Sequence, residues 1–182
     1  MRRYIIIIAT KWGKYDENGA KKSESAVKSS KLHKKGGAEM LTGEFKHTLD
    51  TKGRVFVPAK FRADLGQNVI VAKTFGKFLV MYSEEEWINF MEKLDALSET
   101  EDIGDMKRYI MKNAMPTDVD AQGRINISAE HRAFAGLVKD ISFIGMRKYV
   151  EIWCSDTANE ETEDYNIELF KEQSKKIHLG FC

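Results

Sequence analysis

The sequence has few of the residues that mark several common classes of protein. Its 182 residues include only two cysteines, Cys154 and Cys182, and two prolines. Two cysteines without metal-ligand spacing cannot form a disulfide framework, which favours a reducing cytoplasm. The longest apolar run near the N-terminus, residues 5–9, is too short for the apolar region of a signal peptide. It is also far short of the roughly 20 residues that span a membrane, so we expect no membrane association.

The motifs of common enzymes are missing as well. The chain contains no phosphate-binding loop, no His-Glu-x-x-His and no Gly-x-Ser-x-Gly. Its four histidines, at positions 33, 47, 131 and 178, do not have metal-ligand spacing. We therefore expect no enzymatic activity, no cofactor, no metal site and no small-molecule substrate.

Charge is unevenly distributed, although the net charge is only +1. Residues 1–39 carry ten Lys and Arg against four Asp and Glu, whereas residues 40–182 carry 19 against 24. Residues 11–39 are rich in Lys, Ser, Gly and Ala and offer little to bury, so we expect residues 1–39 to be a flexible basic extension. Any binding of nucleic acid by the rest of the chain has to come from local clusters of charge.

An internal repeat with an offset of 70 residues follows Met40. Residues 49–58 (LDTKGRVFVP) align with residues 119–128 (VDAQGRINIS), and Asp, Gly and Arg coincide. The duplication predicts two units built mainly from strands, at 44–86 and 114–157. Helices over 87–113 separate them, and a C-terminal helix and tail follow at 158–182. The expected fold class is α+β, with the two repeats forming one small β-barrel.

Local signals place the elements within each unit. Gly53 and Gly123 supply the positive φ of a tight turn before an alternating strand, and a short helical turn follows each strand. Ser83 with Glu86 predicts a helix start, and apolar residues then recur at helical spacing as far as Leu97. Further helices are expected over about 101–113 and 162–176.

The repeated motif is Asp-x-x-Gly-Arg, at Asp50–Arg54 and Asp120–Arg124. Residues four apart across a tight turn can face each other, so each Asp can accept hydrogen bonds from its Arg. One interpretation is a purely structural clasp that holds the turn and keeps both aspartates ionised. The other is that the clasp also presents the Arg for a phosphate or a guanine edge. Both can hold, because a pre-oriented Arg loses less rotamer freedom on binding.

Local charge favours DNA contact at the first motif. Lys52 stands beside Arg54, and we expect Lys60 and Arg62 nearby, with few acidic residues between 43 and 62. The second motif has Arg124 and Arg132 but more acidic neighbours. The candidate DNA-binding residues are Asp50, Lys52, Arg54, Lys60, Arg62, Asp120, Arg124 and Arg132.

The chain from Met40 onward resembles the MraZ family of bacterial transcriptional regulators, of the SpoVT–AbrB class of swapped-hairpin DNA-binding folds. The similarity is carried by residues 49–62, the second Asp120–Arg124 motif, residues 143–145 and residues 151–153. It implies two hairpin repeats that intertwine within one chain, DNA contact through the Asp-x-x-x-Arg loops and a ring-like homo-oligomer. It also implies binding to short direct repeats upstream of the division and cell-wall gene cluster, including the protein's own promoter. Such a protein would be cytoplasmic and associated with the nucleoid.

Two points stay open at this stage. Ser128 stands where the family usually has Pro, which bears on the rigidity of that corner. An alternative function is a ring-forming interaction or assembly protein, or an antitoxin-like module, whose loops bind a protein partner. Direct repeats upstream of the gene would favour the regulator.

Overall fold

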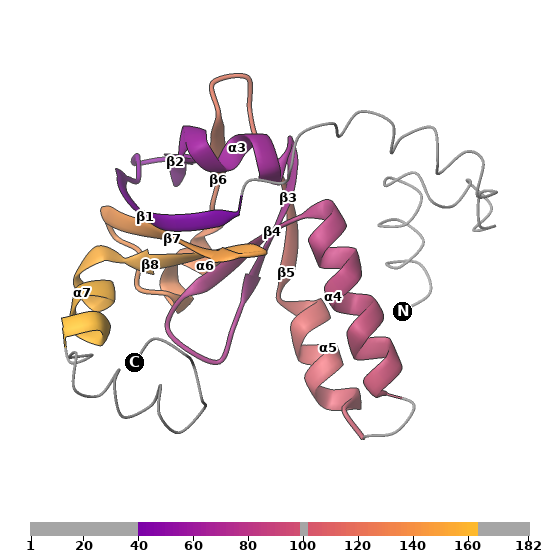
Figure 1. Cartoon of the computed structure of the whole chain (residues 1–182). Helices are drawn as coiled ribbons and strands as arrows, with labels where there is room; N and C mark the ends of the chain where they lie inside the picture. The colour runs from indigo at the N-terminus through magenta and orange to yellow at the C-terminus, as the bar shows by residue number, and fades with distance from the viewer. Residues whose placement is uncertain (1–39, 99–101, 164–182) are drawn as a thin grey trace, which may run out of the picture. The chain divides into compact units, whose positions relative to one another are not determined.

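The computed structural model describes residues 40–98 and 102–163, which form an α+β fold (Figure 1). In the first repeat the elements are β1 (Leu41–Thr48), β2 (Arg54–Phe56), α3 (Ala59–Leu65), β3 (Asn68–Lys73) and β4 (Leu79–Ser83). Two helices follow, α4 (Glu84–Leu97) and α5 (Gly104–Lys112). The second repeat contains β5 (Ala114–Asp118), β6 (Arg124–Asn126), α6 (Ala129–Phe134), β7 (Asp140–Arg147) and β8 (Tyr149–Cys154), and α7 (Ser155–Glu163) comes last. The order of elements is the same in both repeats, as the duplication predicts.

The strands form an open sheet and a small ribbon instead of the expected barrel. Within the described residues the sheet is six-stranded, with the order β1-β7-β8-β4-β3-β5, and all its pairings are antiparallel. β2 and β6 pair with each other in a separate two-stranded sheet. The prediction of a closed barrel is therefore wrong. Closure would require β1 to pair with β5, and these strands form opposite edges of the sheet.

Strands of the two repeats pair with each other in one sheet. β1 of the first repeat pairs with β7 of the second over the whole of Leu41–Thr48, and β5 of the second pairs with β3 of the first. β4 pairs with β8, so both repeats contribute neighbouring strands to the middle of the sheet. Neither repeat can complete its sheet without the other.

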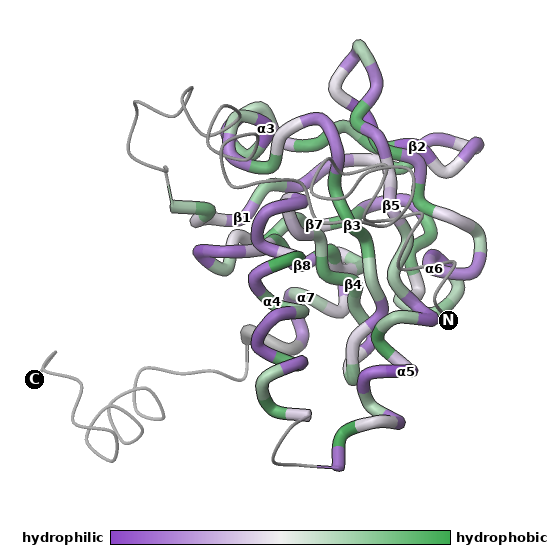
Figure 2. Tube along the Cα trace, turned by 90° about the vertical axis from the view of Figure 1, so that its right-hand side faces the viewer, coloured by the Kyte–Doolittle hydropathy of each residue, from purple (hydrophilic) through white to green (hydrophobic). Residues whose placement is uncertain are grey.

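A single hydrophobic core joins the repeats. Phe61 of α3 and Phe143 of β7 are fully buried, and they belong to one cluster together with Val55 of β2 and Ile125 of β6. In Figure 2 the green, hydrophobic stretches follow β3 and β4, whereas α4 and α5 alternate between green and purple. The ribbon of β2 and β6 is thus attached to the core of the sheet through its inward side chains.

The helices between the repeats begin and pack as their sequences indicate. The Ser83 hydroxyl caps α4 by accepting a hydrogen bond from the backbone N–H of Glu86 at 3.2 Å. Trp87 and Leu94 are buried, but Leu97 at the end of the helix is 49% exposed. α4 and α5 run side by side (Figure 1), joined by an ion pair between Lys107 and Asp95.

The last described helix begins before the helix predicted over 162–176. The structure has α7 at Ser155–Glu163, and most of the predicted helix over 162–176 lies outside the described residues, as does the basic segment 1–39. None of the described helices is both long and apolar enough to cross a membrane.

Candidate nucleic-acid interface

The first repeated motif forms the predicted clasp. One carboxylate oxygen of Asp50 accepts hydrogen bonds from the backbone N–H groups of Lys52 and Arg54, at 2.9 and 2.8 Å. The other oxygen accepts from Nε of Arg54 at 2.8 Å and lies 2.7 Å from its Nη2. The backbone N–H of Gly53 donates to the carbonyl of Asp50, which closes the turn. A single carboxylate therefore fixes both the loop backbone and the arginine.

The second motif repeats this geometry. Asp120 accepts from the backbone N–H groups of Gln122 and Arg124 at 2.9 Å each, and from Nε and Nη2 of Arg124 at 2.9 and 2.8 Å. Gly53 and Gly123 both have the positive φ that the turn requires, 82° and 83°.

Both aspartates are held in their ionised form. Backbone and side-chain hydrogen bonds from Arg54 lower the pKa of Asp50 to about 2. The side-chain and backbone hydrogen bonds from Arg124 likewise lower the pKa of Asp120. An acid–base pair made of two carboxyl groups needs one of them protonated, so this arrangement does not suit the two aspartates as such a pair.

The β2–β6 ribbon brings the two motifs onto one surface. Val55 is paired with Ile125, and both are buried, so the alternate residues of each strand lie on the other face of the ribbon. Arg54 stands opposite Asn126, and Phe56 stands opposite Arg124. Arg54 and Arg124 are diagonal neighbours, which are typically about 7–8 Å apart in an antiparallel pair. We call these four residues, with the loops 50–53 and 120–123, the ribbon face.

The loops lie at opposite ends of this ribbon, and each is bonded to the other repeat. The carbonyl of Gly123 accepts a hydrogen bond from the backbone N–H of Val57 at 2.9 Å. The carbonyl of Gly53 accepts one from Ile127 at 2.8 Å. The loop 120–123 projects beyond the sheet at the top of Figure 1. The two loops are therefore held by the same ribbon at a fixed separation.

Two residues of the ribbon face were not among the predicted site residues. Phe56 is 49% exposed, and the Cζ atom of Arg124 lies 5.8 Å from the centre of its ring. The side-chain amide of Asn126, oriented to donate, lies 3.3 Å from the carbonyl oxygens of Lys52 and Gly53. Their positions follow from the alternation in RVFV and RINI, which places the first and third residues of each strand on one face.

The arginines of the short helices lie at the opposite motif from the one expected. Arg62 was expected near the first loop, but its guanidinium lies against Gly123 of the second loop. Arg132 of the second repeat lies against Gly53 of the first. The pairing of β2 with β6 explains the difference, because each short helix follows a strand that is paired with the other repeat's strand. Lys52 is exposed in its loop, and Lys60 is exposed on α3.

The histidines in the described residues have packing roles. His131 is 4% exposed; its Nδ1 lies 2.8 Å from the Ser128 hydroxyl and its Nε2 lies 3.0 Å from the carbonyl of Asn113. His47 packs its ring edgewise on Phe143, and its pKa is lowered by burial and by the nearby positive charge of Arg62.

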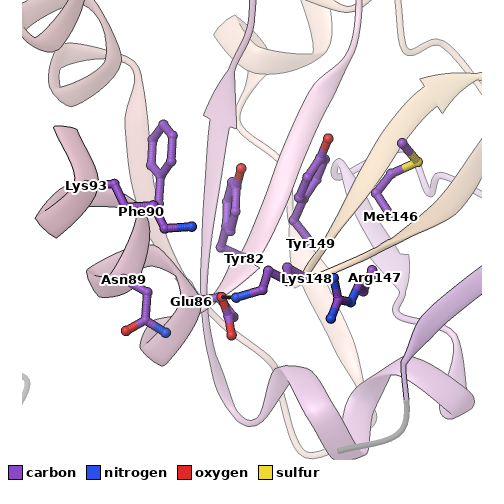
Figure 3. A pocket seen from close by; sticks show the side chains of 9 residues that line it. All are labelled: Tyr82, Glu86, Asn89, Phe90, Lys93, Met146, Arg147, Lys148 and Tyr149. Atoms are coloured by element: carbon purple, nitrogen blue, oxygen red, sulfur yellow. Dashed lines mark hydrogen bonds and ion pairs between the residues drawn. The ribbon is translucent and has the colours of Figure 1, made fainter. Parts of the chain in front are cut away.

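A shallow hollow of about 330 Å³ lies elsewhere, between α4 and the β7–β8 turn (Figure 3). The rings of Tyr82, Phe90 and Tyr149 line it, and an ion pair between Lys148 and Glu86 crosses its rim at 3.1 Å. Burial raises the pKa of Tyr82 to about 12, so this phenol remains neutral at physiological pH. None of the residues of the ribbon face lines this hollow.

Comparison with known proteins shows to which family the chain belongs. Residues 40–108 and 110–177 each match the family described as "MraZ protein, putative antitoxin-like". The chain belongs to the MraZ family. The double match also agrees with the duplication, since each MraZ segment contains one Asp-x-x-Gly-Arg motif.

Relatives of the chain in the MraZ family carry the name transcriptional regulator MraZ. The protein of Lachnoclostridium phytofermentans is 37% identical over 142 residues, which cover 78% of this chain and 100% of the relative. That of Caldanaerobacter subterraneus is 40% identical over 129 residues, covering 70% of this chain and 90% of the relative. That of Acetivibrio thermocellus is 38% identical over 142 residues, covering 78% and 99%. These names describe regulators of transcription and not enzymes.

Proposed function

We propose that this protein is a sequence-specific DNA-binding regulator of transcription that contacts DNA with its ribbon face. The observation that carries the proposal is the pair of arginines, Arg54 and Arg124, each held by an aspartate on the same outward side of one ribbon. The names of the MraZ relatives support the same function.

The geometry of the clasps suits recognition of DNA. In each arginine, Nε and Nη2 are engaged by the aspartate, and Nη1 has no partner in the part of the chain that the structure describes. Planar guanidinium groups bind phosphate oxygens or the O6 and N7 atoms of guanine. Because the aspartate already fixes the side chain, less rotamer entropy is lost on binding.

The proposal of a homo-oligomer follows from the net charge of residues 40–182. Residues 40–182 carry more acidic than basic residues, so one copy with two short basic loops would bind DNA weakly. A ring-like homo-oligomer that presents the ribbon face several times would bind short direct repeats through multivalency. The resemblance to MraZ proteins supports direct repeats upstream of the division and cell-wall genes, the protein's own promoter among them, and a cytoplasmic, nucleoid-associated location.

The decisive experiment is a gel shift on the DNA upstream of the protein's own gene, at two salt concentrations, against a scrambled fragment of equal length. We expect specific binding that weakens with salt. Equal binding to both fragments, or none, would contradict the proposal. Light scattering at micromolar concentration should show an oligomer, and a single species of about 21 kDa would contradict the multivalent mode.

A second candidate is favoured by the antitoxin-like wording of the family description. In that case the ribbon face would bind a protein partner, and DNA contact would be incidental. The same gel shift separates the two, because only a regulator distinguishes the upstream fragment from the scrambled one.

A further inference from the structure

Each loop of the ribbon face is covered by an arginine from the other repeat. A Cβ atom placed on Gly123 would clash with Nη1 of Arg62 and lie 2.9 Å from its Cζ. A Cβ atom placed on Gly53 would lie 2.9 Å from Cζ and 3.1 Å from Nε of Arg132. The two guanidinium groups therefore lie directly against the loop glycines, in two related contacts.

The covering arginines shield the loop glycines from solvent. Gly53 and Gly123 are buried, although their neighbours Lys52 and Gln122 are exposed. A glycine at the tip of an exposed loop would ordinarily be in contact with solvent. These two glycines are needed both for the positive φ of the turn and for the close approach of an arginine.

No carboxylate in the part of the chain that the structure describes neutralises the charges of the covering arginines. Among residues 40–98 and 102–163 no ion pair is found for Arg62 or Arg132, in contrast to Arg54 and Arg124. Nε of Arg132 is buried without a hydrogen-bond partner in the same part of the chain. The pKa of His47 on β1 is lowered first by burial and then by the charge of Arg62, so this charge also reaches β1. Arg62 is exposed and Arg132 is half-buried, so an acceptor from outside the chain, such as a phosphate oxygen, can bind the parts of these guanidinium groups that reach the surface.

We propose that the DNA-contacting units are composite, each built from a loop of one repeat and a helix arginine of the other. The first unit is Lys52 and Arg54 with Arg132, and the second is Arg124 with Arg62. The helix arginines are positioning residues for the opposite loop and add a cation beside it. The DNA contact in this inference rests on the proposed function, whereas the positioning of each loop by an arginine of the other repeat does not.

The positioning is tested without DNA, by amide hydrogen exchange in the intact chain. The backbone N–H groups of Gly53 and Gly123 are hydrogen-bonded within their loops and should exchange slowly. In Arg62→Ala we expect exchange to accelerate several-fold at Gln122 and Gly123 and to stay unchanged at Lys52 and Gly53. Arg132→Ala should give the opposite pattern. Lys60→Ala, on the same helix as Arg62, is the matched control and should change neither loop.

The DNA part is tested by double-mutant cycles of binding affinity. Each single variant, Arg62→Ala and Arg124→Ala, should weaken binding by about tenfold, and the double variant by clearly less than the product of the two. Arg62→Ala combined with Arg54→Ala should give the full product. The reciprocal test pairs Arg132→Ala with Arg54→Ala.

The outcomes are distinguishable. Faster exchange in the loop of the same repeat, or in both loops equally, would overturn the composite units. Coupling of Arg62 to Arg54 instead of Arg124 would overturn them as well. If the wild-type protein does not bind DNA, the proposed function fails, while the exchange experiment still decides whether each helix arginine positions the opposite loop.

Discussion

Arg54 and Arg124 make the same bonds to their aspartates but have different neighbours across the ribbon. Arg54 stands opposite Asn126, whereas Arg124 packs on the ring of Phe56. The side chain of Arg54 is 36% exposed and that of Arg124 only 20%. Of the two, Arg54 is thus the more accessible to a ligand, and Arg124 is the more involved in the packing of the protein.

This difference predicts unequal effects of removing the two arginines. Arg54→Ala should weaken DNA binding by about 1–3 kcal/mol for each base or phosphate that the guanidinium binds, multiplied across subunits in a multivalent complex. Arg124→Ala should cost less affinity but lower the melting temperature more, because it removes both the clasp and the packing on Phe56. DNA affinity and melting temperature measured side by side check this. Loss of binding in Arg124→Ala with an unchanged melting temperature, while Arg54→Ala still binds, would reverse the assignment.

The low pKa of Asp50 predicts how acid affects stability. Folding lowers this pKa from 3.8 to about 2, so the folded state favours the ionised carboxylate. The stabilisation is complete above about pH 4 and is lost as the pH falls toward 2. Asp50→Asn should therefore be less stable than the wild type at pH 7, and the difference should shrink between pH 4 and pH 2.

Melting temperatures recorded across that pH range test the prediction. Asp120→Asn should behave in the same direction, because the pKa of Asp120 is also lowered. Parallel curves for Asp50→Asn and the wild type between pH 4 and pH 2 would show that the clasp does not contribute.

At the scale of elements, the corner before α6 differs in chemistry but not in shape from the corner before α3. Ser128 has φ −59° and ψ 152°, close to the −50° and 131° of Pro58. Its hydroxyl accepts a hydrogen bond from the backbone N–H of His131 and lies within bonding distance of the His131 ring. The serine therefore replaces the rigidity of proline with a cap at the start of the helix.

Removing this cap should cost stability without changing the fold. Ser128→Ala should lower the free energy of unfolding by about 1 kcal/mol, the typical cost of removing a cap. Ser128→Pro should cost less, because proline fits the observed φ and restricts the unfolded chain. Urea unfolding of both variants measures the difference, and a Ser128→Pro variant less stable than Ser128→Ala would show that proline's restriction of the backbone brings no stability at this corner.

At the scale of the whole molecule, we expect the described fold to form without the basic N-terminal segment. Residues from Glu39 onward form a compact unit of their own, and the MraZ match begins at residue 40. The core cluster draws its members from both repeats, from Leu41 to Ile152.

Deleting residues 1–39 should therefore leave folding, assembly and recognition of the specific site intact. The ten Lys and Arg of the segment can add only non-specific phosphate contacts, so the salt dependence of DNA binding should become shallower. Circular dichroism, light scattering and gel shifts at several salt concentrations test this. Loss of the oligomer or of sequence preference in the truncated protein would place part of the functional domain before residue 40.

The sequence by itself determined what depends on neighbours along the chain. The Asp50–Arg54 clasp, the glycine turn and the Ser83 cap each involve residues within four positions, so spacing alone predicts them. The 70-residue repeat likewise predicted two units with the same order of elements. The clasp, the turn and the cap each have a short-range physical cause, and each is confirmed, as is the shared order of elements in the two repeats.

Only the tertiary structure decided how the repeats combine. The order of the strands places β1 and β5 at opposite edges of the described sheet, so this sheet does not close into a barrel. Pairing between the repeats also places Arg62 against Gly123, more than 60 positions away in the sequence. The cluster of basic residues around Arg54 had predicted a place for Arg62 near the first loop. Contacts of this kind depend on which strand pairs with which, because pairing between distant segments is set by the burial of one shared core and not by local preference.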